Sequence, residues 1–335
     1  MRSSMVAVRR PRRSVAGSSW SRPQAQTLSV AHPVYQDLRV ILHHESPLVN
    51  IPEATYMCAA ATAWAPAGGQ QLADVMFRLG MGSHGRCTSV SAQNPILQVD
   101  SRAHFIRDED GDIGIIVCQG QDASEAGFWL SAAGSQNCAM PDGRGEVHRG
   151  FLNSMLPLWD SVVGWLSTPA TAVRRLFVTG HGVGGAIAVL LGARLAAVGL
   201  VSLRADGCTR LQGIHTFGQP RVGDHEFAAW AEEWVGECYC RYVYHSDPMS
   251  HRPVSLLGYQ HAGRECHVEG GQWKLRPNRA ATTVSALLRL GQQGARTLAR
   301  RVVRGSAGGR PHPHHGVEHY LRVSRAAVNR AVFFP

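Results

Sequence analysis

The sequence predicts an α/β fold in which a mostly parallel central sheet is flanked by helices. Short apolar runs that suit buried strands alternate along the chain with longer segments whose apolar residues recur at helical spacing. In addition, a glycine-rich turn at 179–185 joins one of these strands directly to an apolar helix. Strands that alternate with helices usually form parallel sheets with helical crossovers, so we expect this architecture for most of the chain.

Length and composition fit a large globular domain. The chain has 335 residues, of which 44% are hydrophobic and 17% charged, which excludes a mostly disordered or fibrous protein. It contains no run of about 18 apolar residues, so we expect no transmembrane helix. The net charge of +10 raises nucleic acid or an anionic membrane as partners. Because Lys274 is the only lysine, we attribute the arginine excess first to a GC-rich genome.

Much of the positive charge falls in two segments. Residues 1–30 are rich in arginine but lack the apolar stretch of a signal peptide. We therefore expect a disordered basic tail at 1–30, one domain at 31–335 and a cytoplasmic location. The segment 281–304 has the spacing of a basic amphipathic helix, which either packs on the sheet or contacts an anionic membrane surface as a peripheral anchor. With the charge so confined, we expect no nucleic-acid partner.

The eight cysteines are scattered along the chain. Cys238 and Cys240 form a C-x-C pair, not the C-x-x-C pairs of zinc sites, and a chain of this length does not need a disulfide framework. We expect reduced, buried thiols, no metal ion and no organic cofactor. The cysteines are Cys58, Cys87, Cys118, Cys138, Cys208, Cys238, Cys240 and Cys266.

The first half of the chain is expected to begin with helices. The pattern at about 35–80 is mainly helical. Two strands follow at 103–107 and 114–118, and the acidic, glycine-containing turn 108–112 between them indicates a hairpin. The Gly/Ala/Ser-rich stretch 119–145 has the composition of a loop.

The second half is expected to supply most of the sheet. Short apolar runs predict buried strands at 175–179, 213–217 and 240–244, and an apolar helix is predicted at 183–197. Before these strands, a helix is predicted at 151–166. Its apolar face is predicted to be Leu152, Met155, Leu156, Trp159, Val162 and Val163.

The glycine turn has two interpretations. Gly180, Gly182 and Gly185 match G-x-G-x-x-G, which in dinucleotide-binding folds brings a pyrophosphate to a helix N-terminus. Asp206 follows at roughly the spacing of the acid that binds the ribose. Alternatively, the turn is a G-x-S-x-G nucleophile elbow, in which the residue at the position of Gly182 lies at a strained strand-to-helix turn.

The second interpretation rests on a resemblance to a family. The turn reads G-H-G-V-G-G-A at 180–186 and is similar to the G-H-S-L-G-G-A elbow of the class 3 (fungal-type) lipases, which have the α/β-hydrolase fold. Other segments resemble motifs of that family in the family's order, between about residues 35 and 325. The first is the hairpin that ends in C-Q-G-Q at 118–121, where the family has F-R-G-T. The others are V-H-R-G-F-L at 147–152, H-T-F-G-Q-P-R-V-G-D at 215–224, R-Y-V-Y-H-S-D-P at 241–248, G-Y-Q-H-A-G at 258–263 and H-G-V-E-H-Y-L at 315–321. Together they favour the lipase interpretation over the dinucleotide one.

The resemblance implies an arrangement of catalytic positions. The nucleophile, acid and base positions correspond to Gly182, Asp247 and His315, with His319 in reserve for the base. Nucleophile, acid and base come in the chain order of the α/β-hydrolases. The family's oxyanion-hole positions match Gln121 and Val183, and its elbow positions match Gly180, His181 and Gly184. An acyl or lipid-like small molecule in lipid metabolism is the implied ligand.

Glycine at the nucleophile position alters the expected chemistry. Gly182 has no hydroxyl, so ester hydrolysis through an acyl-enzyme is expected to be lost or impaired, since removal of a catalytic serine costs on the order of a millionfold in turnover. One hypothesis is a pseudoenzyme of lipase type. A second is an enzyme in which Asp247 and His315 act as a general base in non-covalent chemistry. A third is an NAD(P)-binding oxidoreductase that uses Gly180, Gly182 and Gly185.

Overall fold

The computed structural model describes residues 52–81, 86–94, 99–120, 137–204, 209–253, 255–276 and 314–333. The predicted basic tail at 1–30, the domain boundary at 31 and the predicted helix at 281–304 lie outside these residues, so they remain predictions. Within the described part of the chain, no helix combines the length and apolar character needed to cross a membrane.

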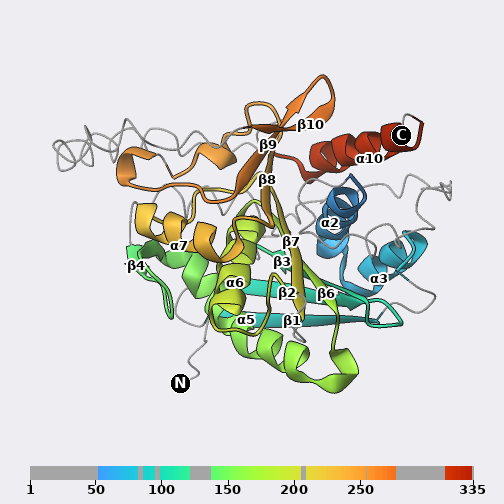
Figure 1. Ribbon diagram of the computed structural model, residues 1–335, viewed down its shortest axis with the longest axis horizontal. Coiled ribbons are helices and arrows are strands. Elements are labelled where there is room, and N and C mark those ends of the chain that lie inside the picture. Colours follow the sequence, from blue (N-terminus) through green and yellow to red (C-terminus); the bar gives the residue numbers. More distant parts are fainter. Residues whose placement is uncertain are drawn as a thin grey trace, which may run out of the picture. The chain divides into compact units, whose positions relative to one another are not determined.

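A mostly parallel sheet of eight strands forms the centre of the fold (Figure 1). Its spatial order is β1-β2-β3-β6-β7-β8-β9-β10. The strands from β3 to β9 are parallel, and antiparallel partners flank them at both edges. In that order the strands are Arg86–Asn94, Val99–Arg107, Ile113–Gln119, Arg175–His181, Arg210–Phe217, Tyr239–Val243, Arg264–Glu269 and Gln272–Arg276.

The predicted strands are confirmed, with the observed strands extending beyond most of them. The hairpin predicted around the acidic turn 108–112 is the antiparallel pair β2 and β3, with Ile106 opposite Ile115. By contrast, β1, β9 and β10 were not predicted. The sequence of β1 is small and polar, R-C-T-S-V-S-A-Q-N, so it lacks the alternation of apolar and polar residues that marks a strand.

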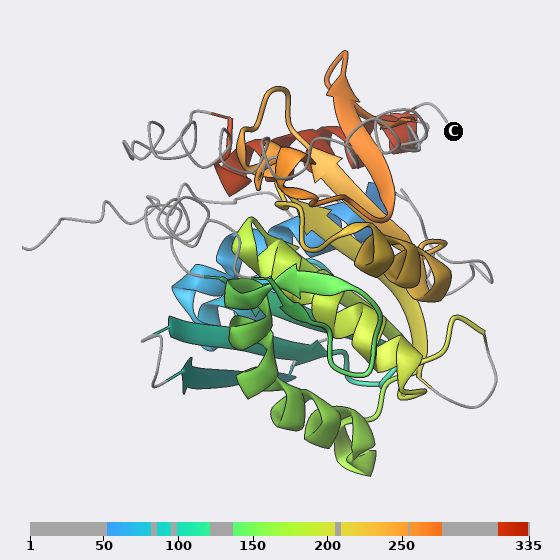
Figure 2. The same cartoon turned by 90° about the vertical axis from the view of Figure 1, so that its left-hand side faces the viewer.

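Helices cover both faces of the sheet (Figures 1 and 2). One face packs against α5, α6 and α7, which share a core with alternate strand residues such as Phe105 and Val178. The other face packs against α2, α3 and α10, where Val117 and Phe177 project because neighbouring strand residues point to opposite faces. The helices are α2 (Pro52–Trp64), α3 (Gly69–Arg78), α5 (Arg149–Ser167), α6 (Val183–Ala197), α7 (His225–Val235) and α10 (Val317–Phe333). Short 3-10 turns lie at Ala65–Ala67, Pro169–Thr171, Met249–His251 and Ser255–Leu257.

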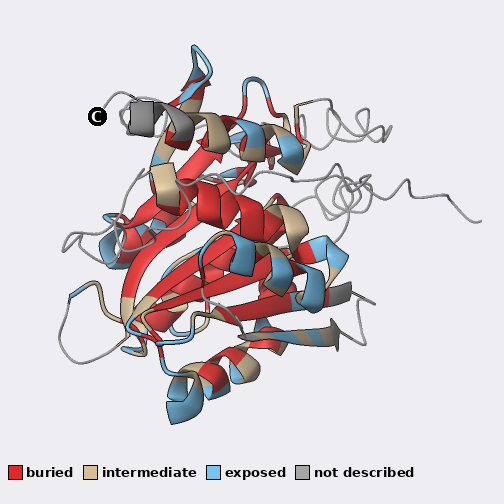
Figure 3. Ribbon diagram, turned by 90° about the vertical axis from the view of Figure 1, so that its right-hand side faces the viewer, coloured by how far each residue is buried: buried red, intermediate tan, exposed pale blue. Residues whose placement is uncertain are grey.

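Helix α6 has the predicted bounds, Val183–Ala197, and is buried on almost every side. It contacts β3, β6 and β7 of the sheet and is covered by α5 and α7. In Figure 3 the central strands are likewise buried, and exposed residues lie on the outer helices. An all-round apolar helix is typical of such a central position, and it explains why the segment showed no polar face in the sequence.

Two sequence predictions need correction. The stretch 119–145 is not loop throughout, because β4 (Asn137–Ala139) pairs with β5 (Glu146–His148) in a second, two-stranded sheet. In α5 the predicted apolar face is shifted, since Leu156 is 38% exposed whereas Leu158 is fully buried. The buried positions Phe151, Met155, Leu158, Val162 and Trp165 follow the alternating spacing of three and four that places residues on one helix face.

The described cysteines are all free thiols. Cys58, Cys118, Cys238, Cys240 and Cys266 are buried, and Cys87 and Cys138 are partly exposed. Cys208 lies outside the described residues. This agrees with the predicted reduced state for the seven cysteines that the structure describes.

Two helical glycines test how closely the helices pack on the sheet. A Cβ added at Gly184 in α6 would lie 2.2 Å from the Cys118 carbonyl oxygen, whereas a Cβ at Gly164 in α5 meets nothing within 4 Å. We expect Gly184→Ala to lower the free energy of unfolding by about 2 kcal/mol or more, because a backbone clash cannot be relieved by a rotamer change. Gly164→Ala should raise it by about 0.5–1 kcal/mol. Urea denaturation measures both, and equal effects would contradict the close approach.

Candidate active site

The turn between β6 and α6 has the geometry of a nucleophile elbow. Gly182 ends the strand and caps the helix with φ +54° and ψ −122°, a conformation that side-chain-bearing residues rarely adopt. Its N–H donates to the Phe217 carbonyl at 2.9 Å, and its own carbonyl accepts from Ala186 at 3.2 Å. The turn therefore has the backbone conformation of an elbow, which glycine at its tip adopts without strain.

The glycines around this turn allow backbone segments to approach closely. A Cβ at Gly180 would lie 2.3 Å from the Gly184 carbonyl oxygen, and a Cβ at Gly120 would lie 2.6 Å from the Gly184 nitrogen. The end of β3 thus lies against the first turn of α6. Packing within the chain thus accounts for Gly180 of the G-x-G-x-x-G match, and Asp206, the acid proposed for the ribose, lies outside the described residues.

Asp247 and His315 lie side by side and face the elbow. Asp247 follows β8 and His315 immediately precedes α10. The His315 Nδ1 is 2.9 Å from Oδ2 and 3.1 Å from Oδ1 of Asp247. The other ring nitrogen, Nε2, would lie 3.1 Å from a Cβ placed on Gly182. The structure therefore brings the three predicted catalytic positions together, 133 residues apart along the chain at their extremes.

The carboxylate of Asp247 is fully buried and surrounded by donors. Besides His315, the Tyr320 hydroxyl donates to Oδ2, and the Met249 N–H donates to Oδ1 at 2.9 Å. Burial alone would raise the pKa of this carboxyl, but the hydrogen bonds from His315, Tyr320 and Met249 outweigh it and hold the pKa below its ordinary value. Asp247 is thus ionised at neutral pH and fixes the Nδ1–H form of His315.

Two residues of this site were not predicted from the sequence. Tyr320 lies in the H-G-V-E-H-Y-L segment but was not assigned a role there. Gly218, at φ +57°, has space only for a hydrogen, because a Cβ there would lie 2.5 Å from Oδ2 of Asp247 and 3.0 Å from the Tyr320 hydroxyl. Both residues lie in segments that resemble the family's motifs, and this could have indicated their roles. Gly218 directly follows a buried strand, and Tyr320 lies close to His315 in the sequence.

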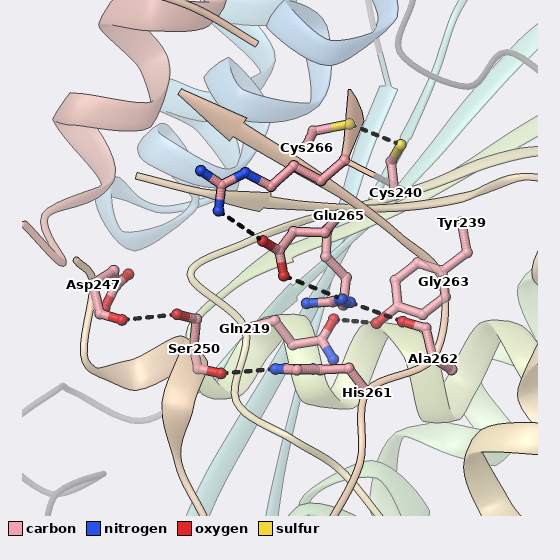
Figure 4. A network of polar contacts seen from close by, with 12 residues as sticks. Gln219, Tyr239, Cys240, Asp247, Ser250, His261, Ala262, Gly263, Glu265 and Cys266 are labelled. Atoms are coloured by element: carbon pink, nitrogen blue, oxygen red, sulfur yellow. Dashed lines mark hydrogen bonds and ion pairs between the residues drawn. The ribbon is translucent and has the colours of Figure 1, made fainter. Parts of the chain in front are cut away.

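A polar network holds the segment that carries Asp247 (Figure 4). The Ser250 hydroxyl donates to the Asp247 carbonyl at 2.7 Å, and the His261 Nε2 donates to the Ser250 carbonyl at 2.7 Å. Next to His261, the Ala262 carbonyl accepts from the buried Arg241 side chain at 2.8 Å. Burial, with help from Arg241 and Arg221, lowers the pKa of His261 far below its ordinary value, so His261 is a neutral structural link.

His181 positions the base from the elbow side. Its Nε2 donates to the His315 carbonyl at 2.7 Å, and the two rings stack with centroids 4.3 Å apart. Burial and the neighbouring His315 lower the pKa of His181 to about 3. The His181 ring is therefore neutral at physiological pH, and its single N–H is the one that binds the His315 carbonyl.

The reserve base, His319, lies elsewhere. It stacks on Tyr244 at 4.9 Å between centroids, and its Nε2 is 3.6 Å from the Glu318 carboxylate. His314 is bonded to the Ser246 hydroxyl at 3.0 Å. Of the described C-terminal histidines, His315 is therefore the one whose imidazole contacts Asp247.

The oxyanion side of the site is described in part. The Val183 N–H opens α6 next to the elbow, and Gly120 packs against Val183, whereas Gln121 lies outside the described residues. Among the residues that the structure describes, no group of three or more His, Cys, Asp or Glu is arranged to hold a metal ion. The described part of the site offers a histidine base, the carboxylate that binds it and a backbone N–H donor.

Along the chain the elbow comes first, then the acid and then the histidine, which is the order of the α/β-hydrolases. The sheet and its flanking helices also have the α/β-hydrolase fold. Within this class, residues 116–256 match the family model for "Lipase (class 3)". This region of the chain is therefore similar to the class 3 lipases.

Individual relatives agree with this assignment. The chain is 31% identical over 144 residues to the secreted mono- and diacylglycerol lipase 1 of Fusarium solani, which covers 41% of this chain and 38% of that protein. Two solved structures share the fold. Lipase II from Rhizopus niveus has a TM-score of 0.50 at 23% identity, covering 64% of this chain and 79% of that one. The Rhizomucor miehei lipase propeptide complex has a TM-score of 0.51 at 23% identity, and the match covers 67% of this chain and 70% of that one. The matched segment thus spans well under half of the Fusarium relative.

The buried state of His181 predicts a pH dependence of stability. In the unfolded chain His181 takes up a proton below its ordinary pKa of about 6.5, but in the folded chain it stays neutral down to about pH 3. The unfolded state therefore holds more protons in this window, and stability falls as the pH is lowered through it.

We expect His181→Gln, which retains a donor for the His315 carbonyl, to remove about 1.4 kcal/mol per pH unit from this slope. Urea unfolding at about pH 6, 5 and 4 measures the slope. His225→Gln, at the exposed first position of α7, is the control. An unchanged slope in His181→Gln, or an equal loss in the control, contradicts the prediction.

Proposed function

We propose that this protein binds an acyl or lipid-like ester in a class 3 lipase site and does not hydrolyse it through an acyl-enzyme. The observation that carries the proposal is the position of His315, whose Nε2 faces the missing side chain of Gly182 at 3.1 Å from the place of its Cβ. The Fusarium relative is a mono- and diacylglycerol lipase, which supports a lipid ester as the ligand class.

The chemistry lost with the serine is the covalent step. In a serine hydrolase the hydroxyl attacks the ester carbonyl while the histidine takes its proton, and the acyl group is held on the enzyme until water releases it. Gly182 offers no oxygen at that point, so no acyl-enzyme forms there. The remaining groups are able to bind and polarise an ester carbonyl, because the Val183 N–H is a backbone donor and does not depend on the residue at position 182.

A second candidate function follows from the intact pair of Asp247 and His315. Asp247 accepts from Nδ1–H, which leaves the lone pair of Nε2 directed toward the elbow. A water in the space of the absent hydroxyl would pass its proton to Nε2 as it attacked the carbonyl, and the imidazolium would return that proton to the leaving alcohol. This mechanism needs no nucleophile from the protein.

Restoring the hydroxyl tests the first proposal. We expect Gly182→Ser to hydrolyse p-nitrophenyl butyrate at least about a hundredfold faster than the wild type, because the serine meets a base that is already oriented. The His315 ring must move by a few tenths of an ångström, since the Cβ would lie 3.1 Å from Nε2. Gly182→Ala is the matched control, because it has the same Cβ and backbone strain but no hydroxyl. Equal rates in the two variants would count against an assembled site.

The wild-type rate separates the two candidate functions. If the pair acts on water, the wild type hydrolyses the ester faster than His315→Ala does, whereas His319→Ala, away from Asp247, retains the wild-type rate. If the site only binds, the wild type and His315→Ala hydrolyse the ester at equal rates. We expect the second outcome, and a wild-type excess that depends on His315 would replace the first proposal with the second.

A further inference from the structure

A second set of serine, histidine and amide side chains lies on the other arm of the sheet. Ser89 of β1 is directly opposite His104 of β2, and His104 is opposite Val117 of β3. The Ser89 hydroxyl is 2.8 Å from the His104 Nδ1, and the His104 Nε2 is 3.3 Å from the Gln119 Oε1. Three adjacent strands thus bring these side chains into one row.

The directions of these hydrogen bonds suit base catalysis. Because Oε1 of Gln119 only accepts, the proton of a neutral His104 ring is on Nε2, and its Nδ1 accepts from the Ser89 hydroxyl. Burial, and to a lesser extent Arg102, lowers the pKa of His104, which outweighs the opposing effect of the bond to Gln119. His104 is therefore neutral and available as a base at physiological pH.

The ends of this row differ in accessibility. His104 is buried at 3% exposure, whereas Ser89 is exposed. On the hydroxyl side, the start of α3 packs closely on Ser89, because a Cβ at Gly69 would lie 2.3 Å from the Ser89 Oγ and would force that side chain to move. Gly69 is the first residue of α3, and the first N–H groups of a helix have no partner within that helix. Such groups stabilise an oxyanion in acyl transfer.

We propose that Ser89 is the nucleophile of a second acyl-transfer site, with His104 as its base and Gln119 as the residue that orients His104. Its substrates are small carboxylic esters that reach the exposed strand β1. The Ser89 oxygen forms a bond to the acyl carbon, the hydroxyl proton passes to the His104 Nδ1, and the ester bond breaks with the alcohol leaving and taking that proton. Water then releases the carboxylic acid by the same route.

This site is separate from the elbow but shares β3 with it. Gln119 ends β3, and the next residue, Gly120, packs against Val183 of α6. Since the two sites use different histidines, variants of His315 leave Ser89 and His104 in place. The outcome for Ser89 is therefore independent of whether the elbow binds or hydrolyses esters.

A fluorophosphonate probe tests the proposal directly, because Gly182 offers no hydroxyl for it to label. The Ser89 oxygen displaces fluoride from phosphorus, and the released proton passes to His104. We expect peptide mass spectrometry of the full-length protein to place the adduct on Ser89, about a hundredfold faster than on any other serine. The adduct should be absent from Ser89→Ala and unchanged in Ser91→Ala, whose side chain lies on the same strand but opposite Arg102.

The role of the base is tested separately. His104→Phe should slow labelling of Ser89 by about a hundredfold, with circular dichroism used to check that the variant is folded. A second comparison leaves His104 intact: the thiol introduced by Ser89→Cys should react with iodoacetamide faster than that introduced by Ser91→Cys. Labelling of Ser89 no faster than of other serines, survival of that labelling in folded His104→Phe, or equal thiol rates would each overturn the proposal.

Discussion

The buried carboxylate of Asp247 is the constraint around which the site is organised. An ionised carboxylate removed from water is tolerated only when hydrogen bonds replace its hydration. Here three donors from two segments replace the water: the His315 imidazole just before α10, the Tyr320 hydroxyl within α10, and the Met249 N–H just beyond Asp247 itself. Satisfying this charge therefore fixes the C-terminal helix against the end of β8, and with it the position of His315.

The elbow constrains the site through its backbone conformation and not through a buried charge. A residue with a side chain at φ +54° and ψ −122° carries about 1–3 kcal/mol of strain, which serine hydrolases accept because it exposes the nucleophile. Glycine at position 182 removes this strain together with the hydroxyl. Glycine at this position thus stabilises the backbone of the turn, while the surrounding glycines and the His181 contact to His315 hold the geometry of an elbow.

The sequence predicted the parts of the fold that are set by local apolar pattern. The bounds of α6 were predicted without error because a glycine-rich turn precedes an unbroken apolar run, and β6, β7 and β8 were recognisable as buried strands. Strand β1 was missed because edge strands have one partner and need no apolar alternation; its residues are held by pairing with β2. Likewise, Leu156 was assigned to the core of α5 because a contiguous apolar run does not show which residue faces outward.

Site residues could be predicted from the sequence where a motif identified them. They could not be predicted where contacts between distant segments determine which residue belongs to the site. Asp247 follows a strand in a recognisable segment, but four histidines lie close together near the C-terminus, and only the fold places the ring of His315 on Asp247 rather than that of His319. Tyr320 and Gly218 gain their roles solely from that placement. The same reasoning applies to Ser89 and His104, which are 15 residues apart in a sequence without any motif. Their contact exists because a two-strand hairpin places them opposite each other, and this is information that only the register of the sheet contains.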